Sequence, residues 1–169
     1  MKAKFFFIPA VLWASHAQAT IYLDIEDAQK LIFPGASFSE HFITLDQVKF
    51  NAIIDDSGVN VYSRNIKAWK ASTGGWFVVD QVRGRDDWIT YAIGVDAAGR
   101  VHQIEILECL DGYDGVRLPN WRAQFYGKKR GANFEDIQTI SGSTMSSGQI
   151  RSGVKRILST LALSLQTPE

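Results

Sequence analysis

Cysteine is nearly absent from this 169-residue chain, which has only Cys109, and histidine is almost as scarce, with three residues. A single thiol excludes an internal disulfide, and Cys109 lies too far from the N-terminal segment described below to serve as a lipoprotein anchor. So few Cys and His side chains are also too few for a zinc cage of the usual type. We therefore expect no metal site and interpret Cys109 as a small buried hydrophobe.

An excess of either charge is also missing, because 18 Lys and Arg residues balance 18 Asp and Glu residues. This balance provides no basic surface of the kind that binds nucleic acid. No combination of nucleophile, base and acid can be read from the spacing of the polar residues, so we assign no catalytic residues. Internal repeats and low-complexity linkers are missing too, and the length fits one domain.

Long apolar runs are missing except at the N-terminus, where "MKAK" is followed by "FFFIPAVLWA" and by "SHAQA". A cationic start, an apolar stretch and an A-x-A ending are typical of a secretory signal peptide. The apolar stretch is shorter than the roughly 20 residues that span a bilayer. We predict that residues 1–19 are cleaved and that residues 20–169 form one periplasmic domain that does not span a membrane. The alternatives are a buried N-terminal strand and an uncleaved anchor.

Processing at that position removes two basic residues and no acidic ones, which leaves residues 20–169 with a formal charge of −2. The domain opens with "YLDIEDAQKLIFPG", which predicts a short helix that stops at Pro34-Gly35. "SEHFITL" predicts a strand. "LDQVKFNAIIDDSG" predicts a second helix, with Asp46 as its N-cap and Gly58 at its end.

The centre of the chain predicts an antiparallel meander of four strands joined by short connections. The strands lie in "VNVYSRNIKAWKA", "GWFVVDQVRGRDD", "WITYAIGVDAAGR" and "VHQIEILECL". Their aromatic residues are expected in the core, namely Trp69, Trp76, Phe77, Trp88 and Tyr91.

The last third of the chain predicts a helical turn in "NWRAQF" and a short strand leading into a loop in "NFEDIQTISGSTMSS". An amphipathic helix follows, whose apolar positions are Ile150, Val154, Ile157, Leu158, Leu161 and Leu165. The expected fold class is α+β: an antiparallel β-sheet with N-terminal helices and a C-terminal helix packed on it.

Residues 141–147, "SGSTMSS", place a hydroxyl-rich run directly before this last helix. A helix N-terminus offers unpaired backbone N–H groups and a positive dipole end, which together favour a phosphate. Gly142 lets the backbone approach an anion closely, and Arg151 in the first turns adds positive charge. Serine-rich segments before helices are more often caps, so these residues alone leave both interpretations open.

The stretch "DIQTISGST", from Asp136 to Thr144, resembles the attachment motif of covalent-FMN proteins, in which an aspartate precedes Ser/Thr-Gly-Ala-Thr. Three further stretches are similar to the small free-standing members of the FMN-binding domain family: "YLDIEDAQKLIFPGA", "GWFVVDQVRGRDDWITYAIGVDAAGRVHQIEILE" and "GVRLPNWRAQFYGK". The same family includes the periplasmic FMN-carrying subunits of the Na⁺-pumping NADH:quinone reductase and of the Rnf complex.

This resemblance implies that Thr144 forms a phosphoester with FMN, which a Mg-dependent flavin transferase installs. Ser141 and Gly142 complete the attachment turn. Ser143 stands where the family has alanine and adds a second possible acceptor hydroxyl. Asp136 lies further from the Ser-Gly pair than in the tightest form of the motif, which implies a displaced position or another role.

The resemblance also implies that Glu108 is a loop acid near the flavin. It implies further that Leu118, Pro119 and Trp121 pack on the isoalloxazine ring. For Trp121, packing in the core is an equal alternative. The basic run Lys128–Arg130 either meets the phosphate or a partner, or is simply solvated.

The function that the resemblance implies is an exported electron carrier with covalent FMN, served by a membrane-bound donor and a cytochrome or reductase acceptor. One alternative is a non-covalent FMN-binding or sensory module of the same fold. Another is a small redox enzyme, although 150 residues leave little room for a substrate domain. We leave enzymatic activity open and favour a carrier.

Overall fold

The computed structural model describes residues 20–109 and 114–165, so the expected signal segment, residues 1–19, lies outside the described residues. The elements in chain order are β1 (Thr20–Ile21), α1 (Ile25–Ile32), β2 (Phe38–Glu40), β3 (Ile43–Thr44), α2 (Gln47–Ser57), β4 (Asn65–Ala71), β5 (Trp76–Arg83), β6 (Trp88–Val95), β7 (Val101–Cys109), η1 (Asp114–Arg117), α3 (Pro119–Arg122), η2 (Ala123–Phe125), α4 (Thr144–Thr160) and η3 (Leu161–Leu165).

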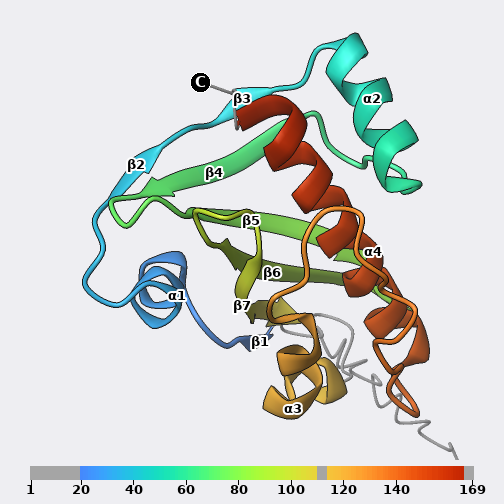
Figure 1. Cartoon of the computed structure of the whole chain (residues 1–169). Helices are drawn as coiled ribbons and strands as arrows, with labels where there is room; N and C mark the ends of the chain where they lie inside the picture. The colour runs from blue at the N-terminus through green and yellow to red at the C-terminus, as the bar shows by residue number, and fades with distance from the viewer. Residues whose placement is uncertain (1–19, 110–113, 166–169) are drawn as a thin grey trace, which may run out of the picture.

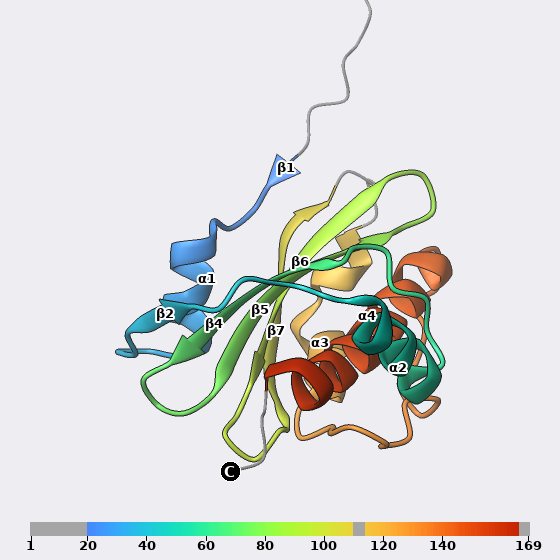
Figure 2. The ribbon, with the colours of Figure 1, turned by 90° about the horizontal axis from the view of Figure 1, so that it is seen from above.

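The described strands form an antiparallel sheet in the order β1-β7-β6-β5-β4-β2, and β3 pairs with β4 beyond β2. Helix α4 lies across one face of this sheet and α1 lies on the opposite face (Figures 1 and 2). The predicted α+β class, with its meander β4–β7, is therefore confirmed. Among the described residues, no helix combines the length and the apolar character needed to cross a membrane.

Local capping explains where the two N-terminal helices begin and end. The Asp24 side chain accepts a hydrogen bond from Asp27 N at 2.8 Å, and Asp46 accepts one from Lys49 N at 2.8 Å. These side chains satisfy backbone donors that would otherwise lack partners at a helix start. Helix α2 ends at Gly58, whose φ of 66° a residue with a side chain rarely adopts. Both helix predictions are confirmed.

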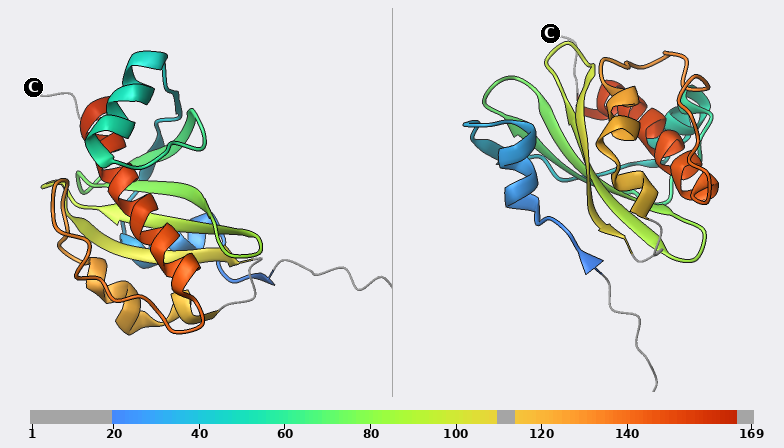
Figure 3. Two further views of the ribbon diagram at one scale, coloured as in Figure 1. Left: turned by 90° about the vertical axis from the view of Figure 1, so that its right-hand side faces the viewer. Right: turned by 90° about the horizontal axis from the view of Figure 1, so that it is seen from below.

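Two apolar clusters cover the two faces of the sheet. On one face, the apolar stripe of α4, with Ile150 and Val154, packs against β6 residues such as Ile93. The other face buries Ala28 and Ile32 of α1. Helix α2 packs beside α4 (Figure 3).

Two expectations about these elements were wrong. Trp69, Trp76, Phe77 and Tyr91 are buried, but Trp88 is 38% exposed. Trp88 begins β6 and lines a groove together with Ile25 of α1, instead of lying within the cluster that α1 covers. The "SEHFITL" strand is divided into β2 and β3, because His41 and Phe42 interrupt it.

The strand predicted within residues 133–140 is also wrong, since this segment runs as turns and loop. Hydrogen bonds from side chains satisfy its backbone groups, where a strand would pair with a neighbouring strand. Gln124 Oε1 accepts from Gln138 N at 2.9 Å, and Trp121 Nε1 donates to Gln138 O at 2.7 Å. The segment is thereby fixed to the α3–η2 region and then leads round to the start of α4 (Figure 3).

Candidate functional site

A tight turn over Ile140–Ser143 leads directly into α4. Ser143 N donates to Ile140 O at 2.9 Å, which closes the turn. Gly142, at its third position, has a φ of 80°, as a type II turn requires. No atom lies within 4 Å of the place where a Cβ of Gly142 would stand, so conformation rather than space selects glycine here.

The two candidate acceptor hydroxyls lie in different environments at the end of this turn. Thr144 is the first residue of α4 and is exposed; its Oγ1 donates to Ile140 O at 3.3 Å. Ser143 occupies the N-cap position, is only 6% exposed, and makes no capping hydrogen bond with its side chain. Thus Thr144 is an exposed residue whose hydroxyl also contacts Ile140 O, whereas Ser143 is almost fully buried.

Ser146 and Ser147 of the hydroxyl-rich run do not cap α4. Both residues lie within the first turns of the helix, which begins at Thr144, and each is 1% exposed. Ser147 Oγ accepts from Ile140 N at 3.3 Å and donates to Thr144 O at 3.0 Å. It therefore ties the attachment turn to the helix instead of capping it.

A pocket of about 280 Å³ opens at this helix N-terminus. Residues 142–146 form one side, and Arg85 from the β5–β6 connection lines it too. The first backbone N–H groups of a helix and its dipole both favour an anion at such a position. Sequence reasoning missed Arg85, because nothing local in "RGRDD" indicates that this connection meets α4.

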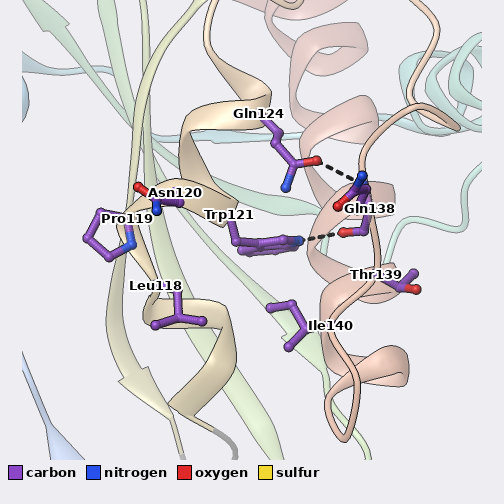
Figure 4. A pocket seen from close by; sticks show the side chains of 8 residues that line it. All are labelled: Leu118, Pro119, Asn120, Trp121, Gln124, Gln138, Thr139 and Ile140. Carbon is purple, nitrogen blue, oxygen red and sulfur yellow. Dashed lines mark hydrogen bonds between the residues drawn. The ribbon is translucent and has the colours of Figure 1, made fainter.

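A second hollow of about 610 Å³ lies beside the attachment turn (Figure 4). It is lined by Leu118, Pro119, Asn120, Trp121, Gln124, Gln138, Thr139 and Ile140. Leu118 is 55% exposed, whereas Trp121 is 5% exposed and packs edge-on against Phe125. Trp121 is therefore mainly a core residue with one edge on the hollow. Ile140 belongs to both the hollow and the turn and so connects them.

The basic run and Asp136 are engaged with each other and with α2. Lys128 Nζ lies 2.6 Å from Asp136 Oδ2, and this hydrogen bond lowers the pKa of the Asp136 carboxyl. Arg130 pairs with Asp56 of α2 at 2.5 Å. Asp136 lines neither of the two pockets described above, whereas Gln138 does.

Two further predicted residues lie elsewhere. Glu108 accepts from Thr90 Oγ1 at 3.4 Å and lines a separate groove of about 750 Å³ on the α1 side of the sheet. Arg151, expected near the phosphate, pairs with Glu135 at 3.2 Å. In the described part of the chain, no group of three or more His, Cys, Asp or Glu residues is arranged to hold a metal ion.

An antiparallel sheet crossed by a helix that begins at an exposed threonine beside two pockets defines a small α+β ligand-binding module. Residues 84–159 match the family model of the FMN-binding domain, which confirms the predicted resemblance over this part of the chain. The match begins in the β5–β6 connection and ends within α4, so it includes Arg85 and the attachment turn. A search of curated protein sequences gave no significant match.

Proposed function

We propose that this protein carries FMN as a phosphoester on Thr144 and transfers electrons outside the cytoplasm, from a membrane-bound donor to a cytochrome or reductase. The exposed Thr144 hydroxyl at the start of α4, inside a stretch that matches the FMN-binding domain, is the observation that carries this proposal.

The geometry of the site fits this cofactor. The 280 Å³ pocket beside Thr144 is suited to a phosphate group, since it combines a helix N-terminus with a guanidinium. The 610 Å³ hollow beyond Ile140 falls within the usual range of small-molecule sites, about 300–1,000 Å³, and has Leu118 and Trp121 for apolar contact. Ser141 and Gly142 shape the turn between the two.

Attachment joins Thr144 Oγ to the phosphorus on the riboflavin side of FAD and breaks the phosphoanhydride bond. AMP leaves, and the hydroxyl proton passes to a base of the flavin transferase, which also supplies Mg²⁺. The chain itself contributes an accessible hydroxyl and backbone N–H groups that stabilise the charge of the product.

The structure favours Thr144 over Ser143 as the acceptor. A transferase has to bring its own catalytic groups to the hydroxyl, and a side chain that is 6% exposed does not permit this without local opening. Thr144 lies on the surface, one residue further on. This difference in exposure supports Thr144 as the acceptor in the folded domain.

When bound, FMN supplies the redox chemistry, while the protein positions the flavin and limits its exposure to solvent. A phosphoester suits an exported protein, because a flavin bound without a covalent link is lost by dilution outside the cytoplasm. Cleavage of residues 1–19 places the carrier in the periplasm in this proposal. Asp136 and Glu108 are assigned no contact with the flavin, since one pairs with Lys128 and the other lines a different groove.

Mass spectrometry of the full chain co-expressed with a flavin transferase tests the attachment. We expect one FMN-sized increment on the peptide that contains Thr144, its loss in Thr144→Ala, and its retention in the matched control Ser143→Ala. Retention in Thr144→Ala together with loss in Ser143→Ala would transfer the acceptor role to Ser143. If flavin copurifies but separates from the acid-precipitated chain, the flavin is bound non-covalently and the phosphoester proposal is wrong.

A further inference from the structure

We infer that Gly115 is a positioning residue for the attachment turn. Because Gly115 has no side chain, η1 packs directly against the turn, and this contact holds the Thr144 hydroxyl in its place. The inference rests on the proposed function and extends it to a residue outside the turn and α4, since Gly115 follows β7 in the chain.

The contact between η1 and the turn leaves no room for a side chain at Gly115. A Cβ at this position would lie 2.9 Å from Ile140 Cγ2 and 3.1 Å from Ser143 Oγ. Separations this short force one of the partners to move. The φ of Gly115 lies outside the left-handed region, so its backbone conformation would also suit alanine. Space therefore selects glycine at position 115, whereas conformation selects it at Gly142.

Ile140 has little freedom to yield to a side chain at position 115. Its N–H donates to Ser147 Oγ at 3.3 Å. Its carbonyl accepts from Ser143 N at 2.9 Å and from Thr144 Oγ1 at 3.3 Å. A β-branched side chain is also stiff about its first torsion. A methyl group at position 115 would therefore displace the Ile140 backbone, and with it the acceptor of the Thr144 hydroxyl.

The same 3-10 helix also leads into the lining of the hollow beside the turn. Leu118 N donates to Gly115 O at 3.1 Å, and the Leu118 side chain lines the hollow together with Ile140 (Figure 4). The packing of Gly115 against Ile140 thus joins two parts of this lining. A shift at this contact would change both the place of the acceptor hydroxyl and the shape of the hollow.

Residue-resolved hydrogen exchange of the unmodified full chain tests the position of the turn without any flavin. The variant Gly115→Ala is compared with the matched control Gly148→Ala, because a Cβ at Gly148 of α4 would meet no atom within 4 Å outside the helix backbone. We expect the Ser143 amide, which closes the turn, to exchange about fivefold faster in Gly115→Ala, as for the loss of one ordinary hydrogen bond. The control should show no faster exchange.

Ile140→Leu tests the contact itself, since leucine has no branch at Cβ and so no atom at the place of Ile140 Cγ2. The double variant Gly115→Ala/Ile140→Leu should return the Ser143 amide toward its original exchange rate. Urea unfolding of each variant checks that the domain is folded. If Gly115→Ala does not fold and Ile140→Leu does not repair it, the contact is not the cause and the inference is overturned.

Flavinylation of the same variants, with a flavin transferase, FAD and Mg²⁺, links the position of the turn to attachment. We expect the initial rate to fall about tenfold in Gly115→Ala, because a displaced reacting group is costly, and to recover in the double variant. An unchanged Ser143 exchange rate, or faster exchange with unchanged flavinylation, overturns the inference while the proposed function stands. If the natural chain takes up no FMN, the proposed function fails, and the exchange rate still decides whether Gly115 positions the turn.

Discussion

At the residue scale, Tyr91 of β6 is a polar side chain held in the core of the described structure. Tyr91 is fully buried, and its hydroxyl donates to Asp80 Oδ2 at 2.8 Å. Arg156 of α4 donates to the same carboxylate oxygen. Burial, reinforced by the charge of Asp80, raises the pKa of Tyr91 well above 10, so the hydroxyl stays protonated and remains a donor. This network fixes the helix that begins at Thr144 to the sheet.

Close packing couples Gly153 of α4 to this tyrosine. A Cβ at position 153 would lie 2.4 Å from Tyr91 Oη and 2.9 Å from Val82 Cγ1. We expect Gly153→Ala to destabilise the domain by about 1–3 kcal/mol through overpacking, despite the better helix propensity of alanine. Tyr91→Phe should lower stability by about 1–2 kcal/mol, because it removes one hydrogen bond to a charged group.

Urea unfolding of the two single variants and the double variant measures the coupling between these sites. The double variant should be more stable than the sum of the single effects predicts, since phenylalanine removes the oxygen that the new methyl group meets. Strict additivity would show that the Gly153 position tolerates a methyl group without pressing on Tyr91.

The site could be predicted from the sequence only where the signal is local. The "SGST" pattern indicates Thr144 and the Gly142 turn, because both depend on neighbouring residues. The burial of Ser143 could not be predicted, since it depends on Gly115 and Ile140, which pack against one another at this point. Arg85 could not be predicted either, because it reaches the pocket through the folding of a distant hairpin.

At the element scale, an ion pair joins the loop before the attachment segment to α2. Arg130 donates to Asp56, and this hydrogen bond, with a second from Ser159, lowers the pKa of the Asp56 carboxyl below its ordinary 3.8. A carboxyl whose pKa is lower in the folded state stabilises the fold above that ordinary value. The stabilisation is lost as the pH falls through the folded pKa.

We therefore expect Arg130→Gln to be less stable than the natural chain at pH 7, by less than about 1 kcal/mol because the pair is partly exposed. The difference in free energy of unfolding should shrink as the pH falls below 3.8. Urea titrations at several pH values, with Lys129→Gln as a control on the same loop, measure this. A difference that persists undiminished in acid would mean that Arg130 stabilises the loop by packing, not by charge.

Helices and strands could be predicted from the sequence where neighbouring residues supply the helix caps, the turn glycines and the alternation of apolar and polar side chains. Asp46 and Gly58 bound α2 as expected, and the turn at Gly99 separates β6 from β7. The 133–140 segment was mispredicted because its apolar positions, such as Phe134 and Ile137, reach the core without strand pairing. Its partners, Trp121 and Gln124, are distant enough in sequence that a pattern of residues gives no sign of them.

At the scale of the whole molecule, the residues next to the expected cleavage site take part in the sheet. Thr20 pairs with Cys109 and Ile21 pairs with Glu108, so the first residues form an edge strand of the sheet. We predict that the exported protein starts at Thr20, which N-terminal sequencing of a periplasmic fraction checks. Ala19→Asp should block processing and leave the full-length precursor with the membrane fraction, because the cleavage site requires small residues. Export without cleavage would contradict the assignment of residues 1–19.

The outer edge of β7 has a further consequence, which concerns pairing with a second chain. Backbone groups of Val101 bond to Gly127 and Lys128, Ile104 O accepts from Arg122, and Leu107 O accepts from Tyr22 and Leu23. An open strand edge is a template on which a second chain can add a strand and start an aggregate. Here a loop, an arginine and the segment that follows β1 occupy that edge at three successive places along β7. These segments of the domain therefore protect the β7 edge from pairing with a second chain.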